Sequence, residues 1–154
     1  MALQAKDLFD LARQMELKVA SIYESMAIRL PPGSREALFY TKMAAQEHIH
    51  AAWVDEMEGL VDPHFLFPDL SREDFTITLS SIEDFHDEVE HEDLSLPELM
   101  EITLHLEGSV AEGFYTRFPS EVPGVPKNLV KRLIRSSVEH AAEVARFRKE
   151  CCKF

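Results

Sequence analysis

The spacing of apolar residues constrains this chain most, because they recur every three or four positions over four long segments. This spacing is typical of amphipathic helices, since it places the apolar side chains on one helix face. The segments cover about residues 4–30, 34–60, 97–118 and 127–152, and breaks containing proline separate them. The sequence therefore predicts an all-α fold with four long helices.

The breaks differ in length, and the difference predicts how the helices are connected. Residues 31–34 and 119–126 are short enough for hairpin turns, whereas the stretch of about 61–96 is a long connection. Ser34 and Ser95 precede helical segments and are predicted N-caps. Two antiparallel helix hairpins joined by a long crossover predict a four-helix bundle.

The length of 154 residues is that of one ordinary domain, so a single domain is expected over 1–154. Within the long connection, the alternation of Phe75–Leu79 predicts an extended segment. A short acidic helix is expected to begin near Ser81.

Five ionisable residues interrupt the apolar faces of the predicted helices. A carboxylate buried alone is very costly, so such groups must be paired, protonated or bound to a metal. Each lies 15–18 residues from its hairpin turn. At the rise of an α-helix this is a depth of about 22–27 Å, so the five meet in one layer if the hairpins pack together. They are Glu16, Glu47, His50, Glu107 and His140.

The two halves of the chain repeat each other around these residues. The stretch from Glu16 to Tyr23 aligns with that from Glu107 to Phe114, and His50-Ala-Ala-Trp-Val aligns with His140-Ala-Ala-Glu-Val. This register favours a metal site over a hydrogen-bonded Glu–His pair. For His140, a hydrogen-bonded core histidine and a metal ligand both remain open. Tyr23 is expected in the core, within reach of a ligand carboxylate.

These motifs resemble the ferritin-like superfamily, and most closely its rubrerythrin-like branch. The resemblance covers the four predicted helices but not residues 61–96, and rests on Glu16-x₆-Tyr and Ala45-Gln-Glu-His-Ile-His-Ala. In that family, each hairpin provides one Glu from its first helix and a Glu-x-x-His from its second, and the six side chains hold two irons. The resemblance implies iron as cofactor, one or two ions, and Mn or Zn also suits these donors. The implied metal ligands are Glu16, Glu47, His50, Glu107 and His140.

The sixth ligand position departs from the family pattern, because it holds Ser137. Glu139 directly precedes His140 and so points about 100° away from it on a helix. The site then has three alternatives: two irons with water filling the gap, a single metal, or recruitment of Glu143 from one turn along. The chain has no Cys-x-x-Cys motif, so the family's rubredoxin module is not expected.

Two classes of function follow, and position 137 discriminates between them. The first is a di-iron oxidoreductase that oxidises Fe(II) or reduces peroxide or oxygen, with a small oxidant and an unidentified redox partner. The second is a non-catalytic ferritin-like domain whose degenerate site has a structural metal or an interaction role. No catalytic residue is assigned from the sequence.

Charge and composition limit the partners and the compartment. The 28 Asp and Glu against 16 Lys and Arg give a net charge of −12, which repels phosphate backbones, so nucleic acid is not expected as a partner. The chain begins without a basic and then apolar signal, and no apolar run approaches the roughly 18 residues that span a membrane. Adjacent Cys151 and Cys152 form no disulfide framework. A cytoplasmic protein without membrane contact is therefore expected.

Self-association as a homodimer is also expected, because ferritin-like bundles commonly dimerise through helix faces. The sequence offers apolar residues beyond the seams of the first two predicted helices, which would form a second apolar stripe. They are Phe9, Leu11, Leu38, Phe39 and Trp53.

Overall fold

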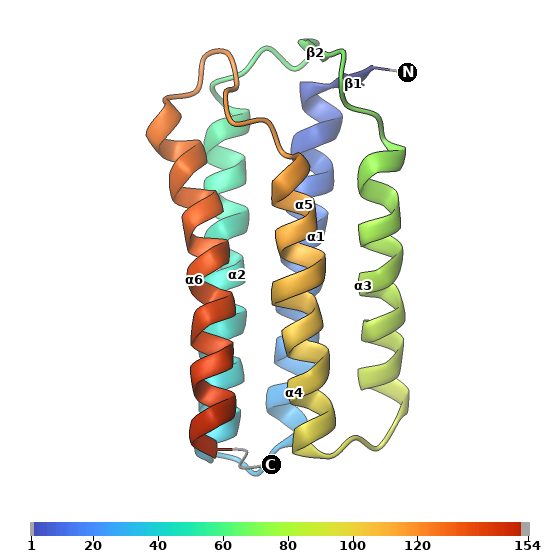
Figure 1. Ribbon diagram of the computed structural model, residues 1–154, viewed down its shortest axis with the longest axis vertical. Coiled ribbons are helices and arrows are strands. Elements are labelled where there is room, and N and C mark those ends of the chain that lie inside the picture. The colour runs from blue at the N-terminus through green and yellow to red at the C-terminus, as the bar shows by residue number, and fades with distance from the viewer. Residues whose placement is uncertain (1, 152–154) are drawn as a thin grey trace.

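The computed structural model describes residues 2–151, with the backbone alone for residues 109–112. The chain is mostly helical, which confirms the predicted all-α class, and its long helices lie side by side along one axis (Figure 1). Strands β1 (Leu3–Gln4) and β2 (Leu66–Phe67) form a small antiparallel pair. The helices are α1 (Ala5–Arg29), α2 (Arg35–Glu58), α3 (Glu73–His91), α4 (Leu96–Leu104), the π-helix η1 (His105–Ala111), α5 (Glu112–Arg117) and α6 (Lys127–Cys151).

The helix starts follow the predicted capping signals. The Ser34 side chain accepts a hydrogen bond from the Ala37 backbone N–H at 3.1 Å and so caps α2. Ser95 and Glu98 form a reciprocal capping box at the start of α4. Gly33, with a φ of 75°, provides the left-handed residue of the α1–α2 turn. Of the predicted segment 127–152, α6 covers all but Cys152, which lies outside the described residues.

The prediction of an extended segment at Phe75–Leu79 is wrong. These residues belong to α3, which lies within the long connection and packs along α1 (Figure 1). Apolar and polar residues alternate there as in a strand, but Phe75, Ile82 and Val89 are the buried residues of α3 and are seven positions apart. That spacing is helical, so burial against α1 decides the conformation over local β-propensity.

The predicted third helix forms with an interruption. The chain passes from α4 through η1 into α5, and these three segments make one continuous column in Figure 1. A π-helix bonds residue i to i+5, so each hydrogen-bonded ring encloses one residue more than in an α-helix. π-helical segments are rare in proteins overall, and those that do occur are frequently found at functional sites. Here the π-helix includes Glu107.

The helices bring two antiparallel pairs together around the core. The turn at Gly33 joins α1 to α2, and α6 runs antiparallel to the column of α4, η1 and α5 (Figure 1). Phe9 and Leu11 of the expected second apolar stripe are buried within the chain and so do not lie on its surface. Exposed apolar surface does remain on α2 at Leu38, which is 61% exposed. Among the described residues, no helix is long and apolar enough to cross a membrane.

Candidate metal centre

Four helical segments bring the five predicted site residues into one buried cluster. Each of the five is at most 4% exposed. They line a common cavity of about 10 Å³ together with Met15, Val19 and Ser137. Such a volume has room for about one water molecule. The residues are Glu16 on α1, Glu47 and His50 on α2, Glu107 on η1 and His140 on α6.

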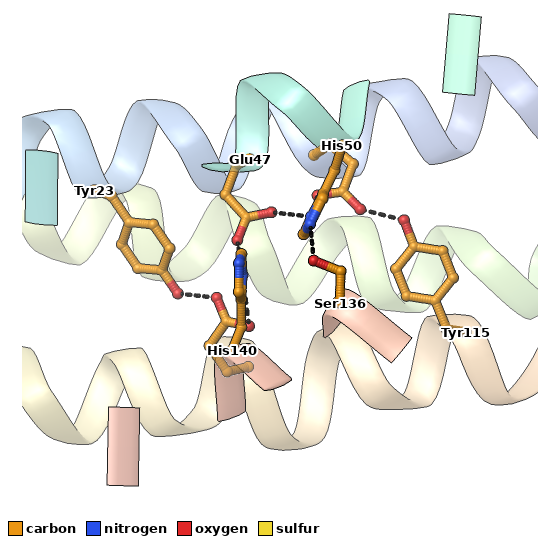
Figure 2. A network of polar contacts seen from close by, with 8 residues as sticks. Tyr23, Glu47, His50, Tyr115, Ser136 and His140 are labelled. Atoms are coloured by element: carbon orange, nitrogen blue, oxygen red, sulfur yellow. Dashed lines mark hydrogen bonds and ion pairs between the residues drawn. The ribbon is translucent and has the colours of Figure 1, made fainter. Parts of the chain in front are cut away.

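Glu47 lies at the centre of this cluster, between the two histidines (Figure 2). Its Oε2 is 3.2 Å from His50 Nδ1, and its Oε1 is 3.0 Å from His140 Nδ1. Each histidine also approaches a second carboxylate: His50 Nδ1 is 3.5 Å from Glu16 Oε2, and His140 Nδ1 is 3.9 Å from Glu107 Oε2. The cluster therefore has two halves, Glu16 with His50 and Glu107 with His140, which share Glu47.

This geometry could hold a metal ion. Glu47, His50 and His140 each offer one ligand atom, and the three atoms lie within 4.8 Å of one another. Carboxylate oxygens and imidazole nitrogens are the donors that Fe, Mn and Zn accept in proteins. Since both imidazoles direct Nδ1 toward the carboxylates, the donor set of this cluster fits a metal site.

Two tyrosines support the outer carboxylates in a crossed arrangement. The Tyr23 hydroxyl of α1 donates to Glu107 Oε1 at 2.6 Å, and the Tyr115 hydroxyl of α5 donates to Glu16 (Figure 2). The predicted contact of Tyr23 with a carboxylate is confirmed. Each tyrosine thus ties its own helix to a carboxylate from the other half, as the partners of metal ligands commonly do.

Sequence reasoning missed Tyr115, because the internal repeat pairs Tyr23 with Phe114. Tyr23 is seven residues after Glu16, whereas Tyr115 is eight residues after Glu107. The extra residue in the π-helix rotates the following chain, so the eighth residue takes the direction of the seventh in a regular helix. Phe114 instead packs against Phe75 with ring centroids 4.9 Å apart.

Ser136 is a second residue that sequence reasoning missed. Its Oγ is 2.6 Å from His50 Nε2 (Figure 2). This bond fixes the ring so that Nδ1 faces the carboxylates, the role that a polar partner of a ligating histidine plays in metal sites. The position could not be singled out from the sequence, since Ser136 is one of two adjacent serines on α6.

The electrostatics of the cluster show how its charges are balanced without a metal. Burial and the neighbouring Glu47 carboxylate raise the pKa of Glu16 to about 8, and the same two causes raise the pKa of Glu107 well above its usual value. Burial also opposes ionisation of Glu47, but hydrogen bonds with Glu16, His140 and His50 outweigh it and lower its pKa. Burial disfavours the His50 cation, yet its bonds to Glu16 and Glu47 raise its pKa to about 10. Protons therefore take the place that a cation would occupy.

Among the residues whose side chains the structure describes, no fourth carboxylate lines the cavity. Ser137 lines it, as the repeat predicts, and Glu139 is exposed on the outer face of α6. Glu143 does not line the cavity, and its Oε1 accepts an ion-pair contact from Lys42 Nζ at 3.1 Å. In the described part of the chain, the ionisable side chains that line the cavity are therefore three carboxylates and two imidazoles.

Comparison with models of known families, with curated proteins and with solved structures finds no match for this chain. The function must therefore be argued from the residues of the site itself.

Proposed function

We propose that this chain is a metal-binding protein of the ferritin-like type that holds iron at the buried Glu–His cluster and oxidises Fe(II) or reduces oxygen or peroxide there. The observation that carries the proposal is the convergence of Glu16, Glu47, His50, Glu107 and His140 on one cavity of about 10 Å³. Burying three carboxylates without a cation is costly, and a divalent ion offsets that cost.

Several features support the resemblance to rubrerythrin-like proteins. The cluster residues stand at the positions of the family motif, one Glu on the first helix of each antiparallel pair and Glu47 with His50 three residues apart on the second. Each outer carboxylate accepts a tyrosine hydroxyl, Tyr115 on Glu16 and Tyr23 on Glu107. These contacts orient the carboxylates toward a shared centre.

The size of the cavity restricts the class of substrate. A space for about one water molecule favours the metal ion itself or a small inorganic oxidant as the substrate. Bound iron would supply the electrons for reduction of such an oxidant. The chain's own contribution is to hold the carboxylates through Tyr23 and Tyr115 and to exclude bulk water by burial.

A second candidate function is a non-catalytic domain with a structural metal. The observation that favours this function is that Ser137 lines the cavity. The three carboxylates that line the cavity do not neutralise the charge of two divalent ions. An uncompensated positive charge weakens the second metal position and with it any two-metal chemistry.

Elemental analysis after aerobic purification, followed by anaerobic Fe(II) titration, tests the proposed function. We expect at least one iron per chain bound at the cluster and its oxidation when peroxide is added. A structural site would bind the metal without oxidising it. A protein that takes up no Fe, Mn or Zn even in excess would refute metal binding altogether.

Metal affinity is expected to rise with pH. Glu16, with a pKa of about 8, and His50, with a pKa of about 10, hold protons at neutral pH that a metal must displace. For each proton that the metal displaces, the metal affinity is expected to rise about tenfold per unit increase in pH, as long as the pH is below the pKa of that group. Calorimetry between pH 6 and 8, in buffers of different ionisation enthalpy, measures the released protons. An affinity independent of pH would contradict this charge balance.

Tyr115→Phe is expected to weaken iron binding by about 10- to 100-fold, the usual cost of losing a partner of a metal ligand. The substitution removes the hydroxyl that Glu16 accepts and leaves the ring in the core. Tyr40→Phe is the matched control, because that buried hydroxyl bonds Thr103 Oγ1 at 2.8 Å and Met100 Sδ at 3.1 Å. Equal affinities of the two variants in an Fe(II) titration would show that Tyr115 does not support the site.

A further inference from the structure

A second and larger pocket lies beside the metal-binding cluster. It has a volume of about 70 Å³ and is lined by Glu107, Ser137, Val138 and Ala141. Glu107 and Ser137 also line the central cavity, so these two side chains border both spaces. Val138 is 61% exposed, which places one wall of this pocket at the protein surface. The pocket therefore leads from the surface to the place where the cluster has a serine instead of a carboxylate.

The charges of the cluster define what would be attracted there. With two divalent ions, three carboxylates leave one positive charge, and neither Glu139 nor Glu143 lines the central cavity. With a single ion, the same carboxylates are in excess. A small anion is therefore favoured beside Ser137 only when both metal positions are filled.

We propose that the pocket beside Ser137 binds a small monocarboxylate, of the size of formate or acetate, which supplies the fourth carboxylate to the metal centre. This inference rests on the proposed metal binding. By the same measure of volume, a water molecule needs about 10–15 Å³, so the pocket has room for about five. Formate and acetate, with three and four non-hydrogen atoms, fit this space.

The occupancies of this anion and of the second metal ion are coupled. Glu107 forms part of the pocket wall, and its carboxylate repels an anion unless a cation lies next to it. The anion in turn neutralises the charge that opposes the second cation. By linkage, each ligand raises the affinity of the other by the same factor.

Anaerobic calorimetry of Fe(II) binding, with sodium acetate or formate against sodium chloride at equal ionic strength, tests the proposal. The carboxylate is expected to raise the affinity of the second iron by about tenfold, within the usual range of such coupling, and to leave the first unchanged. A second-iron affinity equal in all three salts would overturn the inference while leaving metal binding intact. Absence of iron binding in every salt would overturn the proposed function and this inference together.

Two variants locate the effect at this pocket. Ala141→Leu fills the pocket and is expected to lose the carboxylate effect, while Ala142→Leu, the matched control at an exposed position one residue along α6, keeps it. Ser137→Glu brings its own carboxylate and is expected to bind the second iron independently of acetate. A carboxylate effect of full size in both Ala141→Leu and Ser137→Glu would place the anion elsewhere and refute the proposal.

Discussion

Glu47→Ala is expected to abolish iron binding at concentrations that saturate the unmodified protein. Glu47 is the carboxylate that both histidines contact, at 3.2 Å from His50 Nδ1 and 3.0 Å from His140 Nδ1. Its loss removes the group shared by the two halves of the cluster, so both metal positions are affected. The helix itself is expected to persist, because alanine has the highest helix propensity.

Metal content measured on the purified variant, with circular dichroism as the check on folding, gives the result. Glu139→Ala is the control, since it removes one negative charge from an exposed position of α6 and is expected to retain full iron binding. If the alanine variant loses its helical signal, Glu47→Gln replaces it as the test variant, because glutamine keeps the shape of the side chain. Unchanged metal content in either Glu47 variant would show that the cluster is not the metal site.

Ser137→Glu is expected to tighten the second iron position and to accelerate oxidation of bound iron by peroxide. In the unmodified protein, a metal held by Glu16, Glu47 and His50 should bind first, and a second, between Glu107 and His140, only at excess metal. The added carboxylate makes the site neutral with two divalent ions. A charged partner contributes about 1.5–3 kcal/mol, which corresponds to about 10- to 100-fold in the affinity of the second ion.

Anaerobic Fe(II) titration followed by addition of peroxide compares the two proteins. Ala142→Glu is the matched control, because it places the same charge on an exposed residue of α6 that lines neither the central cavity nor the pocket beside Ser137. Two irons bound with equal affinity by the unmodified protein, and oxidised as fast as in Ser137→Glu, would show that position 137 does not limit the site.

The residues of the cluster could be predicted from the sequence because helix geometry fixes their depth. With short turns at 31–34 and 119–126, a residue's distance from the turn determines its height in the fold, and the rise per residue is constant. Glu16 and Glu47 meet for this reason, and so do Glu107 and His140. The N-caps at Ser34 and Ser95 were equally predictable, since the capping bonds involve residues three positions away.

The remaining features depend on contacts or local geometry that the pattern does not contain. The sequence pattern of Phe75–Leu79 predicts an extended segment. Only the packing of α3 on α1 makes this segment helical. The support that Tyr115 gives to Glu16 depends on the π-helix, which shifts the direction of every later side chain relative to a regular repeat. A periodicity of 3.6 residues assigns that role to Phe114 and so misses it.

X-ray diffraction at the iron absorption edge tests most directly whether the buried Glu–His cluster is a metal site. The crystals are grown with Fe(II) under anaerobic conditions. Anomalous scattering locates iron independently of any assumption about its ligands. A peak is expected among Glu47, His50 and the carboxylate of Glu16, with a second, weaker one between Glu107 and His140. Iron found only on the surface, with no peak in the cavity between these side chains, would contradict it.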